Sequence, residues 1–150
     1  MGRETETQAT DRARKINGKI GELMTAVELL QHGFAVNWPT LDVGYDLISD
    51  DGTGSVKRIQ VKTAQKNKGG TYFVHFAKGR IKKCLYTKGD TDFFSVYLNY
   101  GGQPAFYIIP VEEVLGVKGI FWPAGQHPRY PEKWTACKYE TYRSRWDLLR

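Results

Sequence analysis

Three residues have types and a spacing that suit chemistry on a phosphate ester: Asp46, Gln60 and Lys62. Gln60 and Lys62 are two positions apart, so in a β-strand they would point toward the same face. Asp46 belongs to the preceding strand-like segment, and a tight turn between the two segments would bring it opposite Gln60. The spacing therefore predicts a carboxylate, an amide and an ammonium in one small patch on a sheet face.

Each of these residue types has a chemical use in such a patch. Asp46 supplies an anionic hard oxygen for Mg²⁺, and Gln60 can supply a neutral carbonyl oxygen to the same ion. The Lys62 ammonium can orient and polarise an attacking water, or offset charge that develops on a phosphorane. Spacing alone fits a simpler alternative at least as well, in which the polar face of a charged hairpin only meets water.

The patch depends on a predicted β-hairpin. Tyr45–Ser49 and Val56–Ala64 are strand-like, and the sequence Asp50-Asp51-Gly52-Thr53-Gly54 between them is a strong turn signal. Further strands are predicted over Phe34–Trp38, Thr71–Phe76, Asp92–Leu98 and Ala105–Pro110.

A helix is predicted upstream of the hairpin, from Asn17 to His32. Asn17 is a candidate N-cap, and Gly33 supplies the left-handed residue that ends the helix. Residues 1–14 have no clear apolar period and are interpreted as a frayed arm or as the solvated start of the helix. The expected core face consists of the apolar residues that recur at three- and four-residue steps: Ile20, Leu23, Met24, Val27 and Leu30.

Short helical pieces complete the chain. Val111–Leu115 is expected to form a helical turn, and Thr141–Leu149 a short terminal helix, with a surface loop over 121–134 between them. The order of the predicted elements indicates an α/β or α+β fold: a helix comes first, mostly antiparallel strands follow, and small helical pieces come last. The length of 150 residues suits a single domain over 1–150, with 116–150 as a C-terminal extension.

The bulk properties limit the partners and the compartment. A formal charge of +6 is compatible with a polyanionic partner, although many basic proteins bind none. Cys84 and Cys137 lack metal-binding spacing and fit unpaired thiols in a reducing cytosol. No apolar stretch approaches a membrane span, and the polar N-terminus lacks the apolar centre of a signal peptide. We therefore expect a soluble, intracellular, cytoplasmic protein without a membrane partner.

The residues around the patch resemble the PD-(D/E)XK nuclease superfamily, in which an Asp is followed on a hairpin by Glu-x-Lys. The resemblance rests on an ordered set of segments: Gly18-Lys19-Ile20-Gly21-Glu22, His32-Gly33-Phe34, Pro39, Gly44-Tyr45-Asp46-Leu47-Ile48, Arg58-Ile59-Gln60-Val61-Lys62-Thr63, Asp92–Tyr97 and Tyr107–Val114. Their order is similar to a branch of small group I intron-encoded homing endonucleases of cyanobacterial type. Archaeal Holliday junction resolvases are more distant members.

The resemblance implies a restriction-endonuclease-like core, in which an N-terminal helix packs on a mixed, largely antiparallel sheet. It also implies catalysis by Glu22, Asp46, Gln60 and Lys62, with Glu22, Asp46 and Gln60 as ligands of Mg²⁺, for which Mn²⁺ can substitute. From the residues alone, Glu22 lies on a helical stripe with Ala26 and Leu29 and equally fits a solvated glutamate.

Gln60 departs from the superfamily pattern, because most members carry Glu at this position. The amide makes the site less negative and should weaken the binding of a second metal ion, so one Mg²⁺ is expected. Resemblance to the intron-encoded branch implies that Gln is tolerated. The change also keeps open a catalytically inactive DNA-binding module on the same fold.

Basic residues follow the predicted catalytic strands and suit phosphate contacts with double-stranded DNA. The basic candidates are Lys66, Lys68, Lys78, Arg80, Lys82, Lys83 and Lys88. The resemblance adds Thr63, which follows the lysine at a position that is often polar in relatives and could touch a phosphate. A merely solvated basic surface is the alternative. The leading hypothesis is a sequence-specific homing endonuclease that hydrolyses phosphodiester bonds, and the alternative substrate is branched DNA such as a Holliday junction. One site per chain calls for a homodimer or homotetramer to cut both strands.

Overall fold

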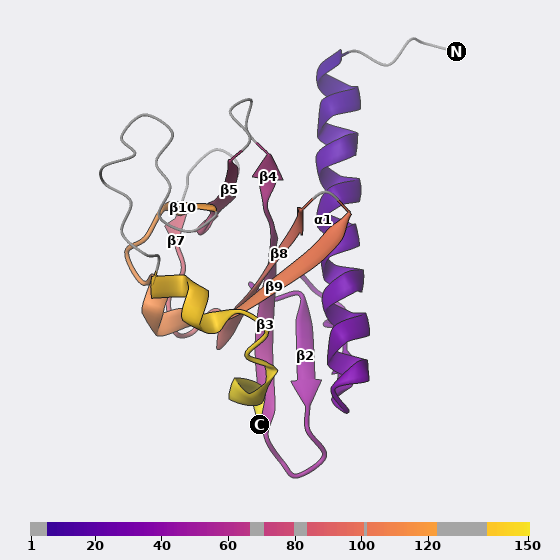
Figure 1. Cartoon of the computed structure of the whole chain (residues 1–150), viewed down its shortest axis with the longest axis vertical. Coiled ribbons are helices and arrows are strands. Elements are labelled where there is room, and N and C mark those ends of the chain that lie inside the picture. Colours follow the sequence, from indigo (N-terminus) through magenta and orange to yellow (C-terminus); the bar gives the residue numbers. More distant parts are fainter. Residues whose placement is uncertain (1–5, 67–70, 80–83, 101, 123–137) are drawn as a thin grey trace.

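The computed structural model describes residues 6–66, 71–79, 84–100, 102–122 and 138–150. Its centre is a five-stranded sheet in the order β1-β2-β3-β8-β9. The strands are β1 (Ala35–Asn37), β2 (Leu47–Asp50), β3 (Val56–Thr63), β8 (Phe93–Tyr100) and β9 (Gln103–Pro110). β3 and β8 are parallel and the other neighbours antiparallel, which confirms the predicted mixed, largely antiparallel sheet. The helix α1 lies along this sheet (Figure 1).

The helix α1 runs from Glu6 to Gln31 and so begins well before the predicted start at Asn17. Residues 6–14 are therefore the solvated start of a helix, and the frayed-arm alternative is wrong for them. Asn17 lies inside the helix and cannot be its N-cap. Gly33 has a φ angle of 84° and follows the last helical turn, as predicted. No helix in the described ranges is long and apolar enough to cross a membrane.

The face of α1 that packs on the sheet differs from the predicted one. Its buried residues are Gly21, Thr25, Ala26 and Leu29. Of the residues expected in the core, Ile20, Leu23, Val27 and Leu30 are 43% to 57% exposed, and Met24 is half-buried. Close approach explains the difference, because a Cβ atom on Gly21 would lie 2.1 Å from Oγ1 of Thr63 in β3. Small side chains therefore form most of the contact face, and the larger apolar stripe points outward.

Two hydrophobic clusters cover the two faces of the central sheet. The cluster on the α1 side includes Leu29, Ile59, Val61 and Ile108. The cluster on the other face includes Phe94, Val96, Leu98 and Ile109. Because Ile59 and Val61 of β3 face α1, the alternating residues of this strand belong to the opposite face. Gln60 and Lys62 therefore lie on the face away from the helix.

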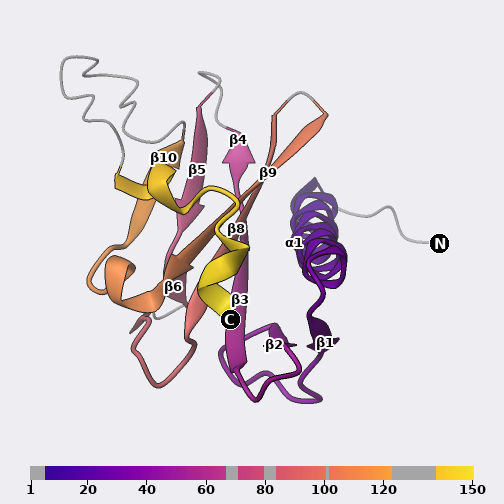
Figure 2. The same cartoon turned by 60° about the horizontal axis from the view of Figure 1, so that its bottom comes forward.

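Smaller sheets lie on that opposite side. One has the order β10-β5-β4, and the other pairs β6 with β7. Their bounds are β4 (Gln65–Lys66), β5 (Tyr72–His75), β6 (Ala77–Lys78), β7 (Cys84–Leu85) and β10 (Gly119–Trp122). The predicted strand over Thr71–Phe76 is thus present as β5, but it belongs to a second sheet (Figure 2).

The chain ends in two 3₁₀ helices rather than in the single helix predicted over Thr141–Leu149. These are η3 (Lys138–Tyr142) and η4 (Trp146–Leu149), and the turn predicted over Val111–Leu115 is present as η1 (Val111–Val114). Ser144 separates η3 from η4 with a positive φ of 53°, and its N–H donates to the carbonyl of Phe106 at 2.8 Å. This bond to β9 seats the C-terminal segment on the central sheet.

Candidate active site

The β2–β3 hairpin brings Asp46 and Gln60 together. Its antiparallel register pairs Leu47 with Ile59, so that Asp46 lies one step further along, opposite Gln60. The Asp46 N–H donates to the carbonyl of Ile59 at 2.9 Å, which extends the pairing to this residue. This is the arrangement predicted from spacing. A turn in which Asp51 Oδ1 accepts the Thr53 N–H at 2.8 Å closes the hairpin.

The carboxylate of Asp46 is half-buried and held by the neighbouring strand. Its Oδ2 atom accepts the backbone N–H of Val61 at 2.8 Å and also accepts the side-chain amide of Gln60. Burial raises the pKa of Asp46 from 3.8 to about 6, with the Val61 hydrogen bond opposing the shift and the charge of Glu22 reinforcing it. Asp46 is therefore a carboxylate whose negative charge is incompletely compensated.

Lys62 extends from β3 on the same face as Gln60. Its Nζ atom lies 4.8 Å from the centre of the Tyr86 ring. Burial lowers the pKa of the Lys62 ammonium, and the negative charge of Asp46 opposes that shift. The three residues singled out in the sequence thus share one site, where an anion and a cation both have reduced access to water.

A cavity of about 520 Å³ opens over these residues. It is lined by Asp42, Val43, Gly44, Asp46, Gln60, Lys62, Ala77, Lys78, Gly79, Tyr86 and Asp90. The carboxylates come from the β1–β2 loop, the residue that directly precedes β2 and the loop before β8. A cavity of this kind combines metal-ligand oxygens with ammonium groups that can face a phosphate.

The donor set fits a hard divalent cation such as Mg²⁺, which prefers oxygen ligands. Of the residues that the structure describes, none forms an ion pair with Asp46, so its charge can be offset by a metal. Those residues contain no group of three or more His, Cys, Asp or Glu side chains placed so that they could hold a metal ion together, so a neutral donor would have to share the ion. Gln60 donates its amide N–H to Asp46 here, and a half-turn of that amide exchanges its nitrogen and oxygen.

Glu22 lies beside this cavity rather than in its lining. The side chain is 19% exposed, and its carboxylate is paired with Lys19 one helical turn earlier. It is near enough for its charge to raise the pKa of Asp46. The helix carries it on the face of the sheet opposite to Gln60, which explains why the two do not converge on a single point. The structure thus joins Asp46, Gln60 and Lys62 and leaves Glu22 at their edge.

A second cavity, of about 570 Å³, adjoins the first at Lys62. It lies between α1 and the ends of β3 and β8, and its lining includes Arg14, Asn17, Lys62, Thr63, Lys66 and Asn99. The charged residues of this lining are all cations, whereas carboxylates line the first cavity. Thr63 and Lys66, two predicted DNA contacts, are thus placed together. Arg14 was not predicted, because it belongs to the polar segment interpreted as an arm.

The other predicted DNA contacts are dispersed. Lys78 lines the first cavity, but its Nζ pairs with Asp90 Oδ1 at 2.6 Å, and Lys88 pairs with Glu112 at 3.7 Å. Four further predicted contacts lie outside the described residues: Lys68, Arg80, Lys82 and Lys83.

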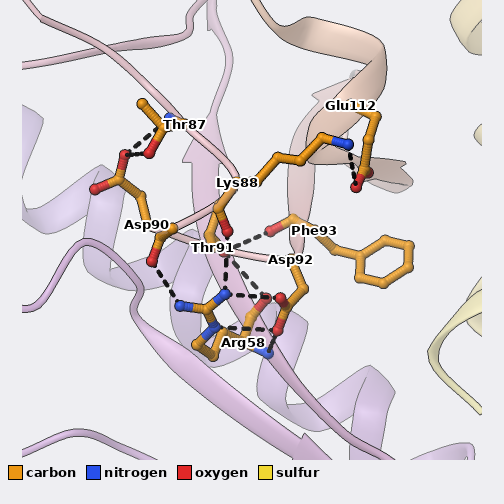
Figure 3. Close-up of polar contacts among 9 residues, drawn as sticks. Arg58, Thr87, Lys88, Asp90, Thr91, Asp92, Phe93 and Glu112 are labelled. Carbon is orange, nitrogen blue, oxygen red and sulfur yellow. Dashed lines mark hydrogen bonds and ion pairs between the residues drawn. The ribbon is translucent and has the colours of Figure 1, made fainter.

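The loop between β7 and β8 is fixed to β3 by Arg58 (Figure 3). The guanidinium donates to Asp92 Oδ1 at 2.8 Å and to the carbonyl of Gly89 at 2.7 Å. Asp90, in the same loop, accepts the N–H of Thr87 at 2.8 Å and so closes the turn. Arg58 therefore holds the wall of the first cavity that carries Asp90. Neither this clamp nor the neighbouring Tyr86 was predicted, since both join segments far apart in the sequence.

Comparisons with known proteins bear on this arrangement. Residues 12–121 match the family model described as PD-(D/E)XK endonuclease. The structure is similar to that of a bacterial homing endonuclease, I-Ssp6803I, with a TM-score of 0.73 and 25% sequence identity over 90% of this chain and 91% of that chain. The structure of MepB aligns with a TM-score of only 0.44, at 15% identity over 70% of this chain and 83% of that chain. A search of curated proteins found no match.

Proposed function

Because this chain belongs to the PD-(D/E)XK endonuclease family, we propose that it is a metal-dependent, sequence-specific endonuclease of the homing type that cuts double-stranded DNA. The observation that carries the proposal is the convergence of Asp46, Gln60 and Lys62 on one cavity of the family's hairpin. The similarity to a bacterial homing endonuclease over nine-tenths of the chain supports the biological role.

The proposed reaction is hydrolysis of a phosphodiester bond by water. Asp46 and Gln60 would hold Mg²⁺, which when bound supplies Lewis-acid polarisation and a more acidic water. The Lys62 ammonium lies over the same cavity, where it can donate a hydrogen bond to the attacking water and offset negative charge on the phosphate. Reduced access to water strengthens both electrostatic effects. Glu22 would act from the edge, through its charge on Asp46.

Metal binding should depend on pH through Asp46, since Mg²⁺ binds the carboxylate and not the carboxylic acid. With a pKa of about 6, this group is ionised above pH 7 and protonated progressively below pH 6. We expect the apparent Kd for Mg²⁺ to rise by about tenfold per pH unit below pH 6 and to level off above pH 7. Magnesium titrations from pH 5 to pH 8 measure this. An apparent Kd that stayed constant from pH 5 to pH 8 would show that burial does not shift the pKa of this group.

The second cavity offers a path for the DNA backbone beside the reacting phosphate. Its cations come from Arg14 and Lys66, Lys62 borders both cavities, and its hydrogen-bonding groups include Thr63 and Asn99. The polyanionic DNA backbone binds favourably where cations are close together. A metal ion binds favourably where carboxylates are close together. The two adjoining cavities therefore suit a strand that passes over Lys62.

Arg14 gives this path a direct test. Its side chain is 63% exposed and pairs only loosely with Asp11, at 3.7 Å, so it can reach a phosphate at low cost. We expect Arg14→Ala to reduce the slope of log Kd against log salt by about one phosphate contact. Binding to a DNA duplex in chelator, over a salt series, measures the slope. Lys15→Ala is the matched control, because Lys15 lines neither cavity; an equal effect there would contradict the proposed path.

An assembly of two or four copies is part of the proposal, because one active site cuts one strand at a time. The exposed apolar stripe of α1 offers a surface through which copies of the chain could pair. Ile16, Ile20, Leu23, Val27 and Leu30 recur at alternating steps of four and three residues and are 43% to 57% exposed. This spacing is the pattern by which helices pair along a seam.

The test of the function compares substrates directly. The purified chain with Mg²⁺ is incubated with a linear DNA library and with a synthetic four-way junction, and the cut ends are sequenced. The proposal predicts cuts at a discrete sequence in linear DNA, with 5′-phosphate ends. Preferential cutting of the junction without sequence preference would replace it with a structure-specific nuclease. DNA binding without cutting would instead identify an inactive binding module, the alternative suggested by Gln60.

A further inference from the structure

The aromatic ring of Tyr86 contacts the Lys62 ammonium in the first cavity. The Nζ atom of Lys62 lies 4.8 Å from the ring centre, and the Nζ atom of Lys78 lies 5.4 Å from it. The face of an aromatic ring carries negative potential, so each ammonium is attracted to it. Tyr86 is 8% exposed, which reduces the competition from water for these contacts.

The ring is itself fixed by the core. It packs edge-to-face with Phe94 of β8, with the ring centres 4.9 Å apart and the planes at 88°. Phe94 is fully buried and meets Phe76 in the same manner, at 5.0 Å and 80°. Edge-to-face contacts of this kind define a ring's position. Tyr86 therefore offers Lys62 a rigid surface, although it follows β7 in a short connecting segment.

Lys62 needs such a surface to have a defined position. Lysine has a flexible four-carbon side chain, and in the described part of the chain no hydrogen bond or ion pair holds this ammonium. Lys78 differs, because Asp90 Oδ1 lies 2.6 Å from its Nζ and neutralises it. Of the two ammonium groups on the ring, only Lys62 thus depends on Tyr86 for its placement.

We propose that Tyr86 is a positioning residue, whose ring face holds the Lys62 ammonium over the cavity beside Asp46. The inference rests on the proposed function for its catalytic consequence, but the placement of Lys62 does not depend on it. A lysine that offsets charge in a transition state must be in place before the charge develops. Tyr86 would hold the Lys62 ammonium in place through the face of its ring and not through its hydroxyl group.

Two variants separate the ring from the hydroxyl group. Tyr86→Phe keeps the ring face, and we expect its kcat to stay within about twofold of the parent. Tyr86→Leu keeps an apolar side chain without the face, and we expect kcat to fall by about tenfold while KM for DNA is unchanged. Equal loss in both variants, no loss with leucine, or a change in KM alone would each overturn the proposal.

A spectroscopic measurement tests the placement without any cleavage assay. In protein labelled at the lysine ε-carbon, the Lys62 ε-CH₂ protons should be shifted upfield by the ring current of Tyr86, and Lys62→Arg assigns the signal. The shift should persist in Tyr86→Phe and be lost in Tyr86→Leu. An unshifted signal in the parent protein would refute the placement even if the leucine variant failed to fold. A shifted signal in a protein that does not cut DNA would leave the placement standing and refute the function.

Discussion

Replacing Asp46 with asparagine is expected to lower the rate of DNA cleavage at least about 1,000-fold, with DNA affinity kept within about threefold. Asparagine has nearly the shape of aspartate, and its side-chain oxygen can still accept the Val61 N–H that Asp46 accepts at 2.8 Å. It cannot supply the negative charge that a metal requires. Loss of a carboxylate near phosphates should not weaken DNA binding. Cleavage rates at saturating Mg²⁺ and duplex binding in chelator measure the two effects.

Asp42→Asn is the matched control for this prediction. Asp42 lines the same cavity but is exposed in the β1–β2 loop. Its substitution removes one negative charge from the cavity without touching the hairpin, and cleavage should stay within about tenfold of the parent. An equal loss in both variants would mean that cleavage depends on the total charge of the cavity. Retained cleavage in Asp46→Asn would exclude Asp46 as a required metal ligand.

The central hairpin was predictable because its signals are local. The turn residues at 50–54 define where the chain reverses, and alternation along β3 defines which residues share a face. Together these place Asp46 opposite Gln60 and set Lys62 on the same face. The similarity of the motifs to a nuclease family then indicated the helix and the mixed sheet, which the structure confirms.

The packing face of α1 was not predictable in the same way. Periodicity shows which residues share a stripe, but a long helix with two stripes does not reveal which one meets the sheet. The larger stripe, with Leu23 and Val27, is exposed, and the smaller one, with Gly21 and Ala26, is buried. Close approach to β3 decides between them, and that distance belongs to the tertiary structure.

Tyr86 and the Arg58 clamp lie beyond sequence reasoning for a related reason. Arg58 of β3 bonds to Asp92 and to the loop before it, more than thirty residues away. Tyr86 reaches Lys62 because the residue that follows β7, the partner strand of β6, lies against the side chain of Lys62 on β3. An isolated tyrosine in a polar segment has no local pattern that signals this contact. The catalytic candidates were thus found in the sequence, and the residues that position them were found in the structure.

The second large effect is expected from Gly21→Ala, which should lower the free energy of unfolding by about 1–3 kcal/mol. A Cβ atom at this position would lie 2.1 Å from Oγ1 of Thr63 and 3.4 Å from the Tyr97 ring, so either α1 would have to move away from β3 or the Thr63 side chain would have to leave its rotamer. The midpoint of thermal unfolding should fall by roughly 3–10 °C for a chain of this size. Cleavage should also fall, because α1 carries Glu22, whose charge acts on Asp46.

Gly18→Ala separates this clash from the ordinary effect of alanine in a helix. A Cβ atom on Gly18 meets nothing within 4 Å, so alanine there should stabilise the helix by up to about 1 kcal/mol. Thr63→Ala provides the reverse test, because it removes the Oγ1 atom and leaves Cβ at 3.4 Å, an ordinary contact. Gly21→Ala combined with Thr63→Ala should therefore be more stable than Gly21→Ala alone. If the second substitution restored no stability, the close approach of α1 to β3 could not be the reason for glycine at position 21.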